Sequence, residues 1–487
     1  MCNDIGVLAR FDRVLGQWHR RHRDASSDEN RRPHNGQGPG DQCPGQKIKH
    51  IVILMMENHS YDNYLGASAL GDGLTKGPSG EWGPTNKTSS GAVVHPFRLS
   101  STAQQVGVPT QSWRASHIQF HHGANDGFVE SIERTVPTGD PVVPMGFWTE
   151  ADLPFYASLA RTFSLADRWF SSLLGPTFPN RRFLIAGTAN GLIDDLPAGI
   201  FDYPRSGSLF DLLDVYNISW ADYHHARTSK VVAKRALGGP GLRACRRVHL
   251  AVGQVWPSLI SVGSQDLEFT ADLYPLGLWR CLRHLRPVGR FFDDARLGNL
   301  PAVSIVDPDF QTCSEENPQN VQIGEGFASA VINAVINGKG WPETLLIWLY
   351  DEHGGYFDHV VPCPAVPPDD VKPHSLLQSG GLLRFVLQRL GYWSKVEDID
   401  RGDEGYDRYG FRVPAVIVSP YSKPGYVSSV VFDHTSILKL IESIWDLPPL
   451  TARDSLAHNP LDDMVDFGRA AFLTRPALSE PARPWRS

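Results

Sequence analysis

The sequence is poor in cysteine and has no closely spaced cysteine pair. No CxxC motif is present in the 487 residues, which argues against a zinc ribbon, and the wide spacing argues against a dense disulfide framework. Because the number of cysteines is even, the sequence leaves undecided whether individual disulfides form. The six cysteines are Cys2, Cys43, Cys245, Cys281, Cys313 and Cys363.

Long apolar runs and an excess of positive charge are also missing. No run approaches the roughly 20 apolar residues of a membrane span, and residues 1–24 lack the apolar core of a secretory signal. By default we therefore expect a cytoplasmic location. The formal net charge is −7 and the basic residues are spread along the chain, so nucleic-acid binding is not expected.

The share of hydrophobic residues, 41%, predicts a globular protein with a large core. Residues 1–47 are polar and rich in Gly and Pro towards their end, which predicts a disordered N-terminal segment. We expect one domain over 48–470, followed by a C-terminal tail over 471–487.

Apolar runs alternate with helical patterns from Lys47 onward, which predicts an α/β fold. Stretches rich in Pro and Gly interrupt this pattern at 66–110, 237–242 and 361–381 and are interpreted as loop insertions. The expected strands are 49–56, 302–306, 344–350 and 413–419, and the expected helices include 208–216, 325–337 and 435–446.

Two of the expected strands end in polar side chains. The run IVILMM is followed by Glu57 and Asn58, and TLLIWLY is followed by Asp351 and Glu352. Neighbouring strands that both end in carboxylates would repel each other unless a cation lies between them, and hard divalent cations prefer oxygen ligands. The pattern thus predicts a metal site, and the alternative is a pair of solvated strand ends.

A third stretch, GPTFPNR, places Thr177 in a turn that is rigid because of Gly175, Pro176 and Pro179. The residues after it can begin a helix whose N-terminus attracts anions. Thr177 is therefore a candidate nucleophile, although a lone threonine in such a loop is more often a capping or turn residue.

Four motifs in order, ENHSYDNYLG, GPTFPNR, YDEHGGYFDHV and FDHTSILKLIE, resemble the phosphoesterase family that contains the phosphatidylcholine-type phospholipases C and a related acid phosphatase. The resemblance covers roughly residues 48–447. It implies an alkaline-phosphatase-like fold, with a central, mainly parallel sheet flanked by helices.

The resemblance also implies roles for residues. Thr177 would attack phosphorus and form a phosphothreonine intermediate. Glu57, Asn58, Asp351, Glu352 and Thr177 would hold one divalent ion, and the residues leave Ca²⁺, Mg²⁺, Zn²⁺ and Mn²⁺ open. Such an ion can lower the pKa of a hydroxyl and neutralise phosphoryl oxygens.

Histidines are the candidates for protonating the leaving alcohol. His353 and His434 match family positions, and His117 lies in a stretch, SWRASHIQF, that resembles one near the family's active site. His359 is a further candidate. His224 and His225 have only a general claim to the site.

Two positions depart from the family pattern, because Gln111 and Asn317 stand where many relatives have histidine. Neither replacement can act as an acid. We therefore expect a metal-dependent phosphoesterase that acts on a phospholipid, with transient contact to a membrane surface, or on a similar diester. The alternatives are an acid phosphatase acting on monoesters and a catalytically weak protein that binds phosphate or headgroups. The oligomeric state stays open.

Overall fold

The computed structural model describes residues 47–195, 202–225, 273–274, 283–374 and 405–485. The expected N-terminal segment, apart from Lys47, and the insertion at 237–242 lie outside these residues. The insertion at 361–381 is described as far as residue 374.

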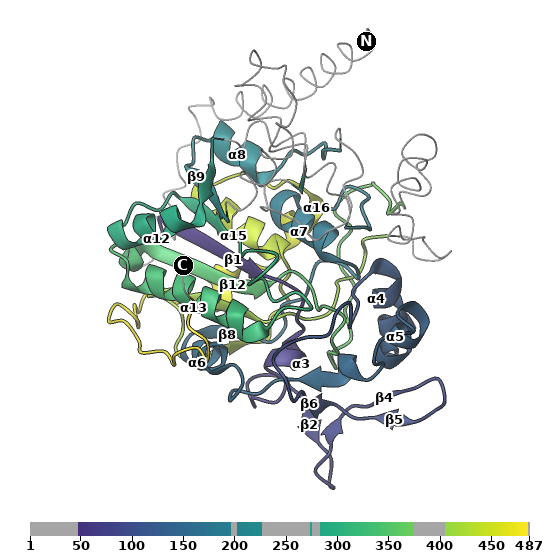
Figure 1. The fold of residues 1–487 in the computed structure, drawn as a ribbon. Coiled ribbons are helices and arrows are strands. Elements are labelled where there is room, and N and C mark those ends of the chain that lie inside the picture. Colours follow the sequence, from purple (N-terminus) through teal and green to yellow (C-terminus); the bar gives the residue numbers. More distant parts are fainter. Residues whose placement is uncertain (1–46, 196–201, 226–272, 275–282, 375–404, 486–487) are drawn as a thin grey trace, which may run out of the picture.

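A central sheet of eight strands forms the middle of the domain (Figure 1). Its strands are β1 His50–Met56, β8 Ser164–Ala166, β9 Trp220–His224, β10 Leu285–Pro287, β11 Val303–Val306, β12 Thr344–Tyr350, β13 Ala415–Val418 and β14 Val427–Ser428. They lie in the order β10-β9-β11-β1-β12-β13-β8-β14. The four strands expected from apolar runs are β11, β1, β12 and β13, which are neighbours in the middle of this order.

The sheet is mainly parallel, as expected. β1 pairs in parallel with β11 and β12, and the pairs of β9 with β10 and β11 and of β8 with β14 are parallel as well. Only β13 runs against both of its neighbours, β12 and β8. The residues of β11, β12 and β13 are buried on both faces, which explains why these strands appear as continuous apolar runs rather than alternating ones.

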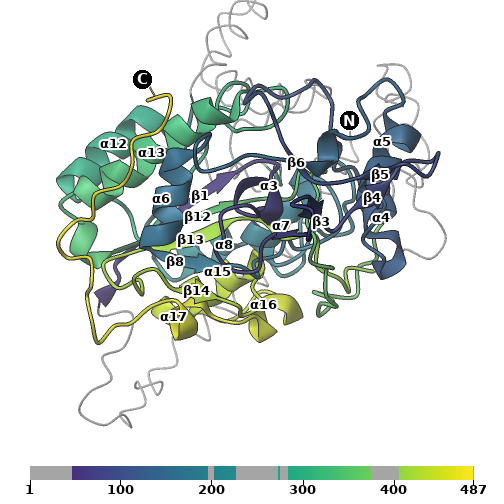
Figure 2. The ribbon, with the colours of Figure 1, turned by 90° about the horizontal axis from the view of Figure 1, so that it is seen from below.

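Helices cover both faces of the sheet (Figure 2). On one face lie α6 Pro154–Thr162, α12 Val288–Leu297 and α13 Val321–Asn337, and on the other lie α15 Thr435–Trp445, α16 Ala452–Leu456 and α17 Pro460–Asp463. Two more helices, α7 Thr177–Ala186 and α8 Leu209–Val215, contact each other, and α7 also packs against α15. The three expected helices correspond to α8, α13 and α15, and the α/β prediction is confirmed.

The insertion at 66–110 forms short hairpins that project from the domain (Figure 1). Its small strands, together with a partner strand near residue 146, are β2 Thr75–Lys76, β3 Trp82–Gly83, β4 Asn86–Lys87, β5 Val93–Val94, β6 Phe97–Arg98 and β7 Gly146–Phe147. The remaining helices of the described segments are α3 Tyr61–Tyr64, α4 Trp113–Phe120, α5 Phe128–Thr135 and the 3₁₀ turns His121–Gly123, Val143–Met145 and Trp341–Glu343.

The segment after residue 470 packs onto the domain. The Trp341 indole N–H donates to the Phe472 carbonyl at 2.8 Å, and the Trp485 ring stacks on Phe292 with 5.3 Å between ring centroids. As far as Trp485, this tail therefore contributes side chains to the packing around α12.

No helix in the described part of the chain is long and apolar enough to cross a membrane. Of the cysteines, Cys313 and Cys363 lie in described segments, and neither is in a disulfide.

Candidate active site

The polar ends of β1 and β12 lie side by side. These strands pair in register from His50 with Thr344 to Met56 with Tyr350, so Glu57 and Asp351 follow directly at the same edge of the sheet. The backbone N–H of Asn58 donates to Asp351 Oδ1 at 3.0 Å. The predicted meeting of the two motifs is thus found, at the carboxyl ends of parallel strands, where α/β proteins place their ligands.

Two glycines after β12 allow this close approach. Gly354 and Gly355 have positive φ angles of 65° and 81°. A Cβ atom on Gly354 would lie 1.9 Å from the Asn58 carbonyl oxygen, and one on Gly355 would lie 2.3 Å from the Thr110 carbonyl oxygen. Any larger residue would push these segments apart, so the motif DEHGG is explained by backbone contact.

Thr177 is the first residue of α7, as the turn GPTFPNR predicted. Its hydroxyl donates to Asn58 Oδ1 at 3.3 Å, and its side chain is buried. Pro176 before it has an extended conformation and ends the preceding loop. The fold therefore brings the threonine, which lies far from the strand ends in the sequence, into contact with the end of β1.

The Asn180 side chain holds the threonine turn together. Its Oδ1 accepts from the Leu173 N–H at 3.1 Å, and its Nδ2 donates to the carbonyls of Gly175 at 2.9 Å and Pro176 at 3.0 Å. Because Asn180 lies three residues after Thr177 on the same helix, this clamp fixes where the hydroxyl lies relative to the sheet.

Arg181 joins the threonine helix to the strand ends. Its Nε donates to Asp351 Oδ2 at 3.0 Å, and its Nη2 donates to the carbonyls of Met55 and Met56, both at 3.2 Å. The Arg181 side chain is fully buried, and Asp307 Oδ1 lies 3.9 Å from its Nη1. Arg181 was not expected here from the sequence, although its spacing of four from Thr177 places both residues on one helix face.

The carboxylates of the site are buried and have little positive charge beside them. Burial raises the pKa of Glu57 to about 8, although Arg181 lowers it and Asp351 raises it further. Burial and the neighbouring Asp351 raise the pKa of Glu352 well above its usual value. Glu57 Oε2 and Glu352 Oε1 are buried without a hydrogen-bond partner in the described residues. Buried polar atoms of this kind normally have a partner, so a cation or a proton is expected there.

The donor set fits a hard divalent cation. Glu57, Asn58, Asp351, Glu352 and Thr177 offer only oxygen ligands apart from the Asn58 amide nitrogen, and two of the carboxylate oxygens have no hydrogen-bond partner in the part of the chain that the structure describes. Their role as ligands stays a prediction. The three carboxylates are not among the described groups of acidic or histidine side chains whose ligand atoms all lie within 4.8 Å of one another.

Such a compact group is formed by Asp62, Asp358 and His359. Here Arg412 already supplies positive charge, since its Nε donates to Asp358 Oδ1 at 2.8 Å and its Nη2 to Asp62 Oδ1 at 3.1 Å. Although burial lowers it, the hydrogen bond to Asp62 raises the pKa of His359 to about 9. With two cationic side chains in place, this group is a charge network that connects loops.

The two histidines at family positions adjoin the site carboxylates. His434 Nε2 lies 2.6 Å from the Asp351 carbonyl oxygen, and Nδ1 has no hydrogen-bond partner among the described residues. His353 Nε2 lies 2.7 Å from Gln119 Oε1, and its Nδ1 lies 3.3 Å from Glu352 Oε2. Burial lowers the pKa of both rings, to about 3 for His353, so both are neutral at pH 7.

The other candidates lie in different surroundings. His117 is half-buried on α4, with Nδ1 2.7 Å from the Trp113 carbonyl oxygen. The His225 ring packs against Phe327, 5.4 Å between centroids, on the side of α13 covered by the C-terminal tail. His224 ends β9, where burial lowers its pKa and Asp307 raises it.

At the second departure from the family pattern, Asn317 has a structural role. Its Oδ1 accepts from the Gly107 N–H at 3.2 Å and its Nδ2 donates to the Pro109 carbonyl at 3.1 Å. The amide therefore ties the 107–109 loop to the segment before α13. A histidine could not make both of these contacts in the same way.

Two further acidic residues belong to this surrounding and were missed. Burial raises the pKa of Glu316 well above its usual value, as do Glu57, Asp195 and Asp351. Asp195 Oδ1 accepts from the Phe178 N–H at 2.9 Å in the first turn of α7. The acidic pair in SEENPQN was a usable signal for Glu316, whereas nothing in the sequence placed Asp195 near Thr177.

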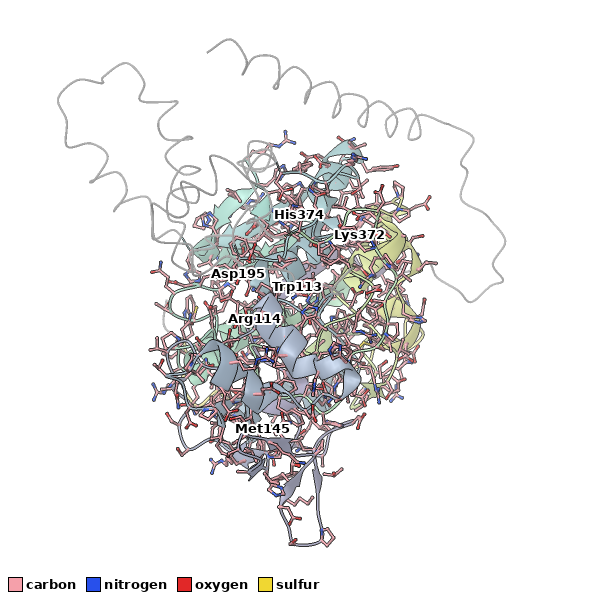
Figure 3. All side chains as sticks on the ribbon, turned by 90° about the vertical axis from the view of Figure 1, so that its right-hand side faces the viewer. Trp113, Arg114, Met145, Asp195, Lys372 and His374 are labelled. Carbon is pink, nitrogen blue, oxygen red and sulfur yellow. The ribbon has the colours of Figure 1, made fainter. Side chains whose placement is uncertain are left out.

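Figure 3 shows the side of the molecule on which α4 begins, with Trp113, Arg114, Asp195, Lys372 and His374 labelled. Arg114 and Lys372 are exposed there. The backbone N–H of His374 donates to the Gly191 carbonyl at 2.9 Å. This hydrogen bond joins the loop that carries Lys372 to the segment that follows α7.

The chain is similar to known proteins over most of its length. A model of the phosphoesterase family matches residues 48–448. The chain is 31% identical over 470 residues to phospholipase C A of Mycobacterium tuberculosis, which covers 92% of this chain and 82% of that protein. It is 27% identical over 414 residues to the hemolytic phospholipase C of Pseudomonas aeruginosa, covering 82% of this chain and 52% of that protein. Among solved structures, human ectonucleotide pyrophosphatase/phosphodiesterase 5 aligns with a TM-score of 0.31 and 11% identity over 64% of this chain and 94% of that chain, an overlap too low to inform the site.

Proposed function

Because the chain belongs to the phosphoesterase family, we propose that this phosphoric ester hydrolase cleaves phospholipids or similar phosphodiesters in the manner of a phospholipase C. The observation that supports this best is the contact of Thr177 with Asn58, since it places a hydroxyl at a helix start beside the buried carboxylates of two strand ends. A phospholipid substrate would also require transient contact with a membrane surface.

In the proposed reaction, Thr177 Oγ1 forms a bond to phosphorus and the bond from phosphorus to the alcohol oxygen breaks. The hydroxyl proton leaves Thr177, and the departing alkoxide takes up a proton to become the alcohol. Water then attacks the phosphothreonine, which restores the hydroxyl and releases the phosphoryl product. Asn180 and the first turn of α7 keep the attacking oxygen in place throughout.

Glu57, Asn58, Asp351, Glu352 and Thr177 would hold one divalent ion. When bound, such an ion supplies positive charge that lowers the pKa of a coordinated hydroxyl and neutralises phosphoryl oxygens. The unpartnered oxygens of Glu57 and Glu352 support this assignment, because one guanidinium, that of Arg181, does not balance the buried carboxylates around it.

Two observations favour an alternative. Gln111 and Asn317 stand where many relatives have histidine, and the Asn317 amide is occupied by backbone contacts. The absence of these two histidines is what we would expect of a weak catalyst, or of a protein that only binds phosphate or headgroups. An acid phosphatase acting on monoesters would keep the same nucleophile.

One assay separates these functions. Hydrolysis of p-nitrophenyl phosphorylcholine and of p-nitrophenyl phosphate is measured for the wild type, for Thr177→Val and for the matched control Thr162→Val, whose hydroxyl donates to the Ser158 carbonyl in α6. We expect hydrolysis of the diester by the wild type and the control alone. Preference for the monoester would indicate a phosphatase, and turnover of neither would contradict the proposal.

A further inference from the structure

The Asn58 side chain indicates where an oxygen of the substrate would bind. It is 1% exposed, and its Oδ1 accepts from the Thr177 hydroxyl at 3.3 Å, whereas Nδ2 has no hydrogen-bond partner among the described residues. An amide nitrogen can only donate, and a buried donor without an acceptor is costly. A phosphoryl oxygen bound beside Thr177 would supply that acceptor.

Asp195 lies next to this position, at the start of the helix that carries the nucleophile. Its Oδ1 accepts from the backbone N–H of Phe178, the residue after Thr177, at 2.9 Å. Asp195 is exposed, unlike the carboxylates at the strand ends. Its charge nevertheless reaches them, because it adds to the rise that burial causes in the pKa of Glu57 and of Glu352. Asp195 therefore brings a negative charge to the solvent side of the site.

The direction of attack decides which part of the substrate meets Asp195. In phosphoryl transfer the attacking and departing oxygens lie roughly in line, on opposite sides of phosphorus. Because Asp195 is hydrogen-bonded to the same helix turn as Thr177, it lies on the attacking side, beside the substituents that stay on phosphorus. In a phospholipase C reaction the group that stays is the headgroup, and the alcohol that departs carries the acyl chains.

We propose that Asp195 is a specificity-determining residue, which favours diesters whose headgroup carries an ammonium over diesters whose headgroup is neutral or anionic. A carboxylate attracts such a cation, and it repels the second negative charge of a phosphomonoester. One residue would thus distinguish a zwitterionic phospholipid from the substrates of an acid phosphatase. This inference rests on the proposed function, which it extends from the reaction to the headgroup.

Two cationic side chains on the same side of the molecule would favour the opposite preference. Arg114 and Lys372 are exposed there (Figure 3). Arg114 belongs to α4 and Lys372 to a separate loop, whereas Asp195 contacts the turn that carries the nucleophile. Coulomb energies fall with distance and are screened at exposed positions, so the charge that contacts this turn should dominate. For an exposed carboxylate we expect an effect of about fivefold on kcat/KM.

Two diesters with the same leaving group test this proposal. p-Nitrophenyl phosphorylcholine carries a quaternary ammonium, and p-nitrophenyl neohexyl phosphate has a neutral carbon in place of that nitrogen. Asp195→Asn keeps an oxygen that can accept from the Phe178 N–H, so it removes the charge and retains the contact. It should lower kcat/KM about fivefold for the choline ester and leave that of the neutral ester within about twofold. Equal losses on both esters, or no loss on the choline ester, would overturn the proposal.

Asp462→Asn is the matched control, because it removes an exposed carboxylate from the first turn of α17. This helix ends at Met464, whose carbonyl accepts from the Ser164 hydroxyl at the start of β8, and β8 runs in the same direction as β12. Asp462 therefore lies near the sheet edge opposite to Asp351, and its variant should leave both rates unchanged. A selective loss on the choline ester in this control would show that net charge matters rather than the position of Asp195, and would overturn the proposal.

Binding measurements distinguish a failure of this inference from a failure of the proposed function. Calorimetric titration with phosphocholine and with neohexyl phosphate requires no turnover. The wild type should bind phosphocholine more tightly, and Asp195→Asn should bind the two ligands alike. A wild type that hydrolyses neither ester but shows this difference would reject the proposed function and support the role of Asp195. Equal affinity of the wild type for the two ligands, or affinity for neither, would overturn that role even in an active enzyme.

Discussion

Removing charge from Glu57 and from Asp351 should change the stability of the metal-free protein in opposite directions. The sequence suggested only that carboxylates at the two strand ends repel one another, so that neutralising Asp351 would relieve the repulsion. The structure shows that Asp351 is the paired member, since it accepts from Asn58 and Glu352 N–H groups and from Arg181 Nε. Glu57, whose Oε2 has no hydrogen-bond partner among the described residues, is the carboxyl whose negative charge would not be compensated.

The magnitudes follow from these contacts. Burial raises the pKa of Glu57 from 4.5 to about 8, so the folded state binds this proton more tightly than the unfolded state. The loss of folding stability that burial of Glu57 causes is absent below pH 4.5, grows as the pH rises and is complete above pH 8. At pH 7 this loss is on the order of 3 kcal/mol. Asp351→Asn instead leaves the buried Arg181 facing an amide, a loss of about 3–5 kcal/mol.

Thermal unfolding in EDTA at pH 7 and pH 5 measures both effects. At pH 7, Glu57→Gln should melt a few degrees above the wild type, and Asp351→Asn should melt below it. At pH 5 the gain from Glu57→Gln should nearly vanish, because the pH is then close to the unfolded-state pKa of 4.5 and protonating this carboxyl on folding costs little, whereas the loss from Asp351→Asn should persist. A stabilised Asp351→Asn protein, or a Glu57→Gln gain that does not depend on pH, would refute this reasoning.

Further predictions concern the nucleophile, its support, the ion and the charge network. Thr177→Val should lose several orders of magnitude in turnover without a change in melting temperature, and retention of a tenth of the activity would reject covalent catalysis by this residue. Asn180→Ala should lower kcat on the order of 10- to 100-fold in steady-state assays by releasing the threonine turn, and an unchanged kcat would show that the turn holds itself. Chelation should abolish hydrolysis and lower the melting temperature, with elemental analysis showing one divalent ion per chain, and full activity in EDTA would contradict the metal site. The hydrogen bond to Asp62 raises the pKa of His359 to about 9, so its stabilisation is complete below about 6.5 and is lost as the pH rises through 9. His359→Gln should therefore flatten the decline in melting temperature between pH 7 and pH 10, and an equally steep decline would contradict it.

The sequence by itself determined the four central strands, the α/β class and the polar residues at the sheet edge. β1 and β12 are buried on both faces, so their apolar runs could be recognised without knowledge of their neighbours. The polar residues that follow them are adjacent in the sequence to the strand ends. A parallel pair in register necessarily brings such residues to one edge. Thr177 could be placed at a helix start for a similar reason, because its turn is encoded by neighbouring Gly and Pro residues.

Only the tertiary structure decided which charges pair and which atoms stay available. Asp351 meets Arg181 across 170 positions of sequence, and His353 meets Gln119 across 234. Side-chain contacts over such separations depend on how helices pack against the sheet, and no local pattern encodes them. The same holds for Asp195 at the first turn of α7 and for Asn317, whose amide bonds the 107–109 loop. Residue types therefore indicated the chemistry of the site, whereas packing determined which side chain bears its unbalanced charge.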